Sequence, residues 1–239
     1  MELSETIALG LLWYVAFLLS ATCHEAAHAL AAKWGGDLTA YSFGQVSLNP
    51  APHIQREPFG MVLVPWLSFL LLTNGQWMMG WASAPYDPYW ARRHTRRSGW
   101  MALAGPVANF ILVLVSGIVI QVGIRTGLFQ LPGSLGMSHL VEASGGLAAG
   151  FATFFSILFS LNLLLGTFNL MPFPPLDGFS VLNIVVPESG AHKLMDLRDS
   201  LGPYMMLGMF AAWKVFDFAY QPIFFVALSI LYPGEVFGR

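Results

Sequence analysis

Long uncharged stretches alternate with short polar ones along this chain of 239 residues. Asp, Glu, Lys and Arg are absent from residues 6–23, 58–86, 98–124, 143–176 and 218–234. A helix that spans a bilayer needs about 20 mostly apolar residues, and at least four of these stretches can supply them. We therefore expect an all-α polytopic membrane protein with about five or six transmembrane or re-entrant helices.

The boundaries of these helices follow from local signals. The first helix should cover residues 6–33, because an apolar run ends there at Gly35-Gly36, a pair that stops helices. Two more strong candidates are residues 98–124 and 148–168. A C-terminal hydrophobic region covers residues 201–231 and is interrupted by Lys214 and Asp217. Residues 187–200 read as a polar loop.

Two segments have a less regular pattern. Apolar residues alternate loosely with polar ones over residues 37–57, which predicts a short β-hairpin at the membrane face. Residues 58–82 are apolar but contain Pro65 and Asn74-Gly75-Gln76. This segment either crosses the bilayer or enters and leaves on the same side, which is acceptable for irregular backbone that protein covers.

The composition of the chain narrows the class of protein further. Hydrophobic residues make up 56% of the chain and charged residues 10%, against about 25% charged in soluble domains. A net charge of −2 without a basic stripe argues against a nucleic-acid partner, and one cysteine excludes an intrachain disulfide framework. Glu2 and Glu5 stand where a cleavable signal peptide would be basic. We expect one membrane domain, 1–239, with its core at about 5–186, a C-terminal helical region at 201–231 and no appended soluble domain.

The first predicted helix carries His24-Glu25-Ala-Ala-His28. Residues four apart share one helix face, so both imidazoles can reach one metal ion. Neutral imidazole suits zinc, and a catalytic zinc site uses three protein ligands with one position open for water. Glu25 can take a proton from that water. A packed polar cluster is the alternative, but ionisable residues within membrane spans are costly and usually functional.

A third ligand is needed, and Asp177 is the best candidate. It is the first charged residue after 34 uncharged ones and follows a proline-rich turn at a helix end. Carboxylate oxygen is a regular zinc ligand, although Asp177 could also cap a helix that starts near Gly178. The remaining histidines lie in predicted loops, where solvated side chains are expected, and comprise His53, His94, His139 and His192.

These motifs bring the chain close to a known family. It resembles the site-2 protease family of intramembrane zinc metalloproteases, in a compact form without an appended soluble domain. The resemblance depends on His24-Glu-Ala-Ala-His28 and on Asn169-Leu-Met-Pro-Phe-Pro-Pro-Leu-Asp177-Gly178, and Gly105-Pro-Val-Ala-Asn109 also matches. With the spacing between them, the motifs cover most of residues 5–186.

The resemblance implies one catalytic Zn²⁺ held by His24, His28 and Asp177, with Glu25 as general base. It implies cleavage within or next to the membrane-spanning segment of a substrate protein or membrane-inserted peptide. It also places Asn169 near the scissile carbonyl, where a buried amide can stabilise an oxyanion. Asn169 could equally be a helix-end residue that satisfies backbone groups. Asn109 reads as interhelical packing and hydrogen bonding, and Cys23 as a buried thiol.

Two other classes fit parts of this pattern. A metal transporter would spread polar residues along a path, whereas here they cluster at two points. An inactive scaffold would be expected to lose Glu25 or a ligand, and all four residues are present. We expect a multi-pass protein of a prokaryotic cytoplasmic membrane. The substrate and the oligomeric state stay open.

Overall fold

The computed structural model describes residues 3–234 and is helical, with no β-strand in that range. Its longest helices are α1 (Leu3–Gly35), α6 (Thr95–Arg125), α7 (Gly146–Asn169) and α10 (Met205–Leu231). All four are long and apolar enough to cross a membrane. The shorter helices are α2 (Thr39–Ser42), α3 (Ala51–Arg56), α4 (Val64–Leu67), α5 (Pro88–Arg93), α8 (Asp177–Val181) and α9 (Glu188–Leu201). The all-α membrane fold is therefore confirmed.

The chain divides into two compact units, described here one at a time. Unit 1 consists of Met1–Thr22, Leu48–Ser83 and Phe110–Leu163, and unit 2 of Cys23–Ser47, Ala84–Asn109 and Leu164–Arg239. The helices α1, α6 and α7 contribute residues to both units.

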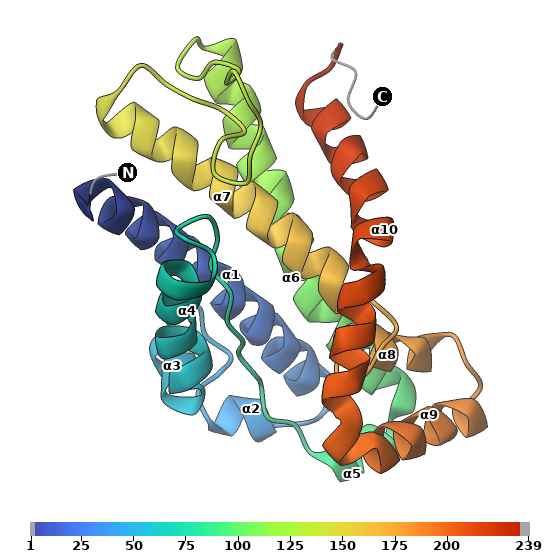
Figure 1. The fold of residues 1–239 in the computed structure, drawn as a ribbon. Coiled ribbons are helices and arrows are strands. Elements are labelled where there is room, and N and C mark those ends of the chain that lie inside the picture. The colour runs from blue at the N-terminus through green and yellow to red at the C-terminus, as the bar shows by residue number, and fades with distance from the viewer. Residues whose placement is uncertain (1–2, 235–239) are drawn as a thin grey trace. The chain divides into compact units, whose positions relative to one another are not determined.

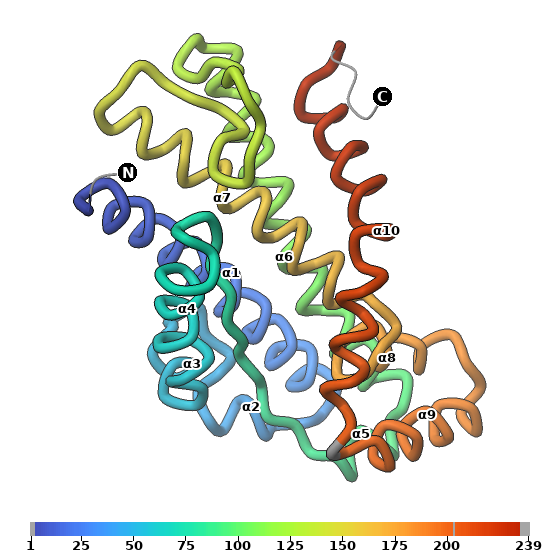
Figure 2. Tube along the Cα trace, viewed as in Figure 1, coloured from blue at the N-terminus to red at the C-terminus, as the bar shows by residue number. Residues whose placement is uncertain are grey.

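In unit 1, the segment after α3 forms a helix that is too short to span a bilayer. Apolar helix runs from Phe59 to Leu72, with π-helical turns on either side of α4. Its 14 residues extend about 21 Å, against a hydrocarbon core of about 30 Å. The chain then reverses at Asn74 and Gly75, both with positive φ. Figure 2 shows the trace turning back and running along the helix it has just left.

Hydrogen bonds tie the returning segment to the helix along its length. The Met79 amide donates to Ser68 Oγ over 3.0 Å, and the Trp81 amide donates to the Gly60 carbonyl over 3.1 Å. At the end of the return, Ser83 Oγ donates to a Glu57 carboxylate oxygen over 2.5 Å. Because residues 57 and 83 meet, the geometry supports the re-entrant alternative for residues 58–82 over a full crossing.

The predicted β-hairpin at residues 37–57 is wrong. This stretch forms α2 and α3 instead, and a polar side chain just before each helix accepts a hydrogen bond from the first residue of that helix. Asp37 Oδ1 accepts hydrogen bonds from the Thr39 amide and hydroxyl over 2.9 and 2.6 Å, and Asn49 Oδ1 accepts the Ala51 amide over 3.0 Å. Prolines in the first turn of α3 cost little, since the amides at a helix start have no intrahelical acceptor.

Unit 2 begins with the C-terminal part of α1. The Gly36 amide donates to the Lys33 carbonyl and the Asp37 amide to the Ala32 carbonyl, over 3.1 and 2.9 Å, with Gly36 at φ +98°. This is the Schellman arrangement that the glycine pair predicts. The loop predicted at residues 187–200 is wrong, because α9 forms there and buries Ala191 and Met195.

The short helices α5 and α9 of unit 2 lie at the N-terminal end of α10 (Figure 1). Met195 of α9 packs with Trp90 and Ala91 of α5 in one buried cluster. At the surface, Arg92 bridges to Asp196 and Asp199 over 2.9 and 2.6 Å. The helix α10 is continuous through Lys214 and Asp217, the two charges that interrupt the hydrophobic run of the predicted helical region at 201–231. Charged residues lower hydropathy there without lowering helix propensity much.

Candidate metal centre

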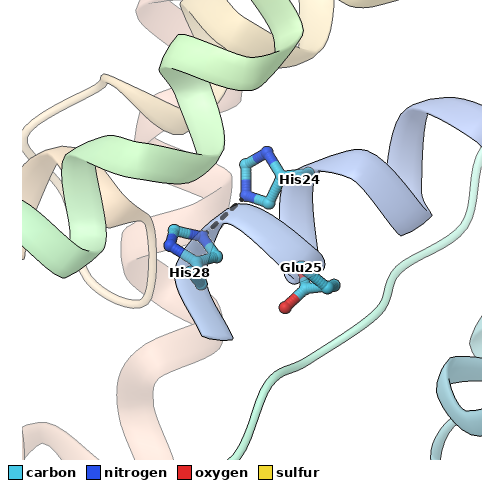
Figure 3. A group of neighbouring side chains, drawn as sticks. All are labelled: His24, Glu25 and His28. Atoms are coloured by element: carbon cyan, nitrogen blue, oxygen red, sulfur yellow. Dashed lines mark hydrogen bonds between the residues drawn. The ribbon is translucent and has the colours of Figure 1, made fainter. Parts of the chain in front are cut away.

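The centre starts from two imidazoles on α1, both in unit 2. His24 and His28 are one helical turn apart, and their Nε2 atoms lie 2.9 Å from each other. Figure 3 shows the two rings side by side, with Glu25 projecting from the helix in a different direction. Both histidines are buried, at 8% and 9% exposure. The predicted pairing of these residues on one helix face is what the structure has.

One face of α6 sets the orientation of both rings. His28 Nδ1 donates to the Met101 carbonyl over 2.7 Å, and His24 Nδ1 lies 2.6 Å from Asn109 Oδ1. With each Nδ1 proton donated to an oxygen, the Nε2 atoms carry the lone pairs that a metal needs. Met101, Gly105 and Asn109 are four residues apart, so they share this face.

Gly105 makes room for the centre. A Cβ at this position would land against Nε2 of both His24 and His28. The glycine of the Gly105-Pro-Val-Ala-Asn109 motif therefore lets α6 approach the ligand atoms without filling the space between them. Asn109 is a positioning residue for His24, through an interhelical hydrogen bond of the kind that the sequence predicted, although the sequence did not predict its partner. The four-residue spacing from Gly105 was the available signal.

Asp177 approaches the same point from the N-terminus of α8. Its Oδ2 lies 3.1 Å from His24 Nε2 and 3.3 Å from His28 Nε2. The alternative of a helix cap is not what the structure has, because Leu176 occupies the N-cap position and no side chain caps α8. Gly178 follows, and a Cβ there would meet the Leu170 carbonyl, so this glycine closes the turn that carries Asp177.

Electrostatics at Asp177 favour its ionised form. Without a metal ion, burial raises the pKa of this carboxyl, whereas a protonated His28 and hydrogen bonds from protonated Nε2 atoms of His28 and His24 act against burial. The net result is a pKa well below the usual range for aspartate. A metal cation at the same point would act in the same direction.

The three converging atoms fit a zinc ion. Two imidazole nitrogens and one carboxylate oxygen form a triangle with sides of 2.9, 3.1 and 3.3 Å. Ligand atoms in a tetrahedral site with bonds of about 2.0 Å lie about 3.3 Å apart. Two lone-pair nitrogens and a carboxylate repel one another at this separation unless a cation lies between them. The donor set is one that zinc accepts and leaves a fourth position for water.

Glu25 lies just beyond this triangle. Glu25 is 7% exposed, and its carboxylate oxygen is within 4.8 Å of the histidine ligand nitrogens. The two histidines can form a set of three donor atoms with either Glu25 or Asp177. These two sets differ in the distances between their donor atoms. The Asp177 set has the separations of direct ligands, whereas the Glu25 separation suits one intervening water.

The remaining candidate residues lie in other surroundings. Asn169 ends α7, and its Nδ2 donates to the Leu165 carbonyl over 3.1 Å, a contact within its own helix. Cys23 is half-buried, and burial of this kind suits a structural thiol. His53 belongs to unit 1 and is buried in α3, so the prediction of a solvated loop histidine is wrong for it.

Comparison with known proteins agrees with a membrane zinc metalloprotease. The family model described as Peptidase family M50, the site-2 protease family, matches residues 12–211. A Bacillus subtilis (strain 168) protein named "Putative zinc metalloprotease YwhC" is 34% identical over 197 residues, which cover 82% of this chain and 78% of that protein. No solved structure matches the chain.

The chain belongs to Peptidase family M50 and is a zinc metalloprotease. Its long apolar helices make it a multi-pass integral membrane protein. The resemblance drawn from the motifs is thereby confirmed.

Proposed function

We propose that this protein is an intramembrane endopeptidase that binds one zinc ion through His24, His28 and Asp177. The observation that carries the proposal is the convergence of His24 Nε2, His28 Nε2 and Asp177 Oδ2 within 3.3 Å of one another. The ligand histidines lie on α1, about 10 to 17 Å from its C-terminal end. A site at that depth in a membrane helix favours a substrate bond that is itself within or next to a bilayer-spanning segment.

The reaction is hydrolysis of a peptide bond. His24, His28 and Asp177 would hold a zinc ion, which would supply the Lewis acidity that polarises the attacking water and the scissile carbonyl. Glu25 takes a proton from the water, whose oxygen forms the new bond to the carbonyl carbon. As the C–N bond breaks, Glu25 passes the proton to the leaving amine. Asn109 and the Met101 carbonyl hold the imidazoles in place during both steps.

Asn169 has a narrower proposed role. A side-chain amide donor near the scissile carbonyl would stabilise the negative charge that develops on its oxygen. Its hydrogen bond to the Leu165 carbonyl would have to be exchanged or shared when substrate binds. We also propose that residues 1–239 act as one protease domain in a prokaryotic cytoplasmic membrane.

The test combines metal analysis with cleavage of a panel of membrane-spanning peptides, for wild type and Glu25→Gln. Glu25→Gln keeps the size of the side chain but cannot accept the proton. We expect zinc content to stay near wild type while cleavage falls by at least about a hundredfold. A variant that cleaves at the wild-type rate would remove Glu25 from the mechanism. A wild type that binds zinc but cleaves only soluble peptides would contradict the intramembrane substrate.

A further inference from the structure

The helix α10 carries two opposite charges near the middle of its length. Asp217 lies about 18 Å from the Met205 end of this helix and about 21 Å from the Leu231 end, with Lys214 one turn before it. Both residues are exposed, although the rest of the helix is apolar enough to span a bilayer. Charged side chains at this depth are costly and almost always face protein or water.

These charges face away from the rest of unit 2. On the opposite side of α10, Ala212 and Phe216 are buried in a cluster with Met171 and Leu176. At about 100° per residue, Lys214 is about 160° around the helix from both Ala212 and Phe216, and Asp217 is about 140° from Ala212 and about 100° from Phe216. The metal centre is carried by α1 and α8, so the charged side of α10 has no role in it.

A continuous exposed stripe contains both charges. Its members recur every three or four residues along α10 and comprise Leu207, Phe210, Lys214, Asp217 and Gln221. We call this set the Lys214 face. The span α10 has the smallest buried share of the four candidate spans, at 17% against 28%, 39% and 50%. The ion pairs described within residues 3–234 involve neither Lys214 nor Asp217.

The Lys214 face of one copy is complementary in charge to the same face of a second copy. Two copies of a membrane protein share one orientation, so a two-fold axis along the membrane normal places their α10 helices parallel. Lys214 of each copy then faces Asp217 of the other with an axial offset of about 4.5 Å. The four-carbon stem of lysine reaches across that offset. Gln221, one turn further on, can hydrogen-bond to its counterpart.

We propose that the Lys214 face is a homodimer interface, held by two reciprocal ion pairs between Lys214 of one copy and Asp217 of the other. Pairing removes four charges from contact with lipid at once. Each copy keeps its own metal centre on the opposite side of α10. The inference therefore does not depend on the proposed reaction.

Charge reversal tests the interface in both directions. Lys214→Asp leaves two acidic residues on the face, and Asp217→Lys leaves two basic ones. We expect each single variant to have a dimer dissociation constant at least about tenfold above wild type, because like charges then meet at low dielectric. A mixture of the two variants should form a mixed dimer, because each supplies the charges that the other lacks.

The measurements are molecular mass in detergent and energy transfer between labelled copies in liposomes. Lys193→Asp, a reversal at an exposed lysine of α9, serves as the control and should dimerise as wild type does. Zinc content near wild type would show that each reversed variant is folded. A monomeric wild type, unchanged dimerisation in both reversals, or failure of the mixture to pair would each overturn the proposal. So would a monomeric wild type whose reversed variants lose cleavage, since the face would then bind substrate.

Discussion

At the scale of single residues, the hydrogen-bonded Nδ1 atoms of the two imidazoles matter as much as the Nε2 atoms that would bind the metal. The Met101 carbonyl can only accept a hydrogen bond, so His28 must donate from Nδ1 and present the Nε2 lone pair. Asn109 does the same for His24 through its Oδ1. The ligand geometry is therefore set before a metal arrives, which lowers the ordering needed for binding.

Asp177 gives the most direct test of the ligand set. Asp177→Ala removes one of three proposed ligands, and we expect zinc affinity to fall by more than about a hundredfold. Loss of a residue that only hydrogen-bonds to a ligand already lowers metal affinity by about 10- to 100-fold. Competition with a chelator of known affinity measures this. Asp196→Ala, which removes an exposed aspartate of α9, is the matched control. Unchanged zinc affinity in Asp177→Ala would place the third ligand elsewhere.

Gly105 tests the space between the ligands. In Gly105→Ala the new methyl group meets Nε2 of His24 and His28, so α6 or the rings must move. We expect reduced zinc occupancy and a loss of cleavage of about a hundredfold, the size of effect that a misplacement of about 1 Å produces. Gly150→Ala is the control, because a Cβ at this α7 position meets nothing within 4 Å. Equal behaviour of the two variants would show that α6 does not confine the metal.

Asn169 separates a chemical role from a structural one. Asn169→Ala should lower kcat by about 10²- to 10³-fold if the amide stabilises the oxyanion, while zinc content stays near wild type. If the side chain only satisfies the Leu165 carbonyl, the rate should hold and only stability should fall, by about 1 kcal/mol. Single-turnover cleavage and thermal unfolding of the same preparation distinguish these outcomes.

At the scale of elements, the re-entrant segment sets the topology. Residues 57 and 83 meet at the base of a helix of 14 residues, so the segment does not carry the chain across the bilayer. The chain between α3 and α6 then stays on one side of the membrane. An excess of Lys and Arg in the loops on that side predicts that it is cytoplasmic. Arg56 and the four arginines of residues 92–97 belong to it.

Cysteine labelling checks this topology in a variant whose single cysteine, Cys23, is replaced by Ala. Gln55→Cys and Arg93→Cys are both exposed positions and should react from the cytoplasmic side with a membrane-impermeant reagent. Asn74→Cys, at the reversal, should stay unreactive from the opposite side, because the helix extends only about 21 Å into a core of about 30 Å. Labelling of positions 55 and 93 from opposite sides would exclude the re-entrant topology.

At the scale of the whole molecule, the metal should stabilise the fold. His24 and His28 come from α1 and Asp177 from α8, so the proposed ion would link segments about 150 residues apart and would bind the folded chain only. Zinc at a thousandfold excess over its Kd contributes about 4 kcal/mol, or roughly 10 °C in Tm for a chain of this size. We expect a chelator to lower Tm by about that amount and to abolish cleavage, with both restored by added zinc.

The matched variant for this experiment is Asp177→Ala. Its Tm should resemble that of chelated wild type and should not respond to chelator or zinc. If chelator abolishes activity but leaves the wild-type Tm unchanged, the ion is catalytic but adds nothing to stability. A chelator that changes neither quantity would contradict the metal centre itself.

The sequence by itself determined the features that depend on local chemistry. Uncharged runs predicted the long helices within a few residues, because a bilayer helix must be apolar along its length. The four-residue spacing of His24 and His28 predicted their pairing, because helical geometry alone brings those atoms together. The Gly35-Gly36 stop was equally local. The motifs were specific enough to indicate the family.

Only the tertiary structure decided what depends on distant segments. Residues 37–57 contain α2 and α3 where weak alternation predicted a hairpin. The meeting of residues 57 and 83 and the hydrogen bond from His24 to Asn109 join positions 26 and 85 residues apart. No local pattern specifies such contacts, because packing of one segment against another selects them. The exposure of Lys214 and Asp217 also required the packing of α10 to be known.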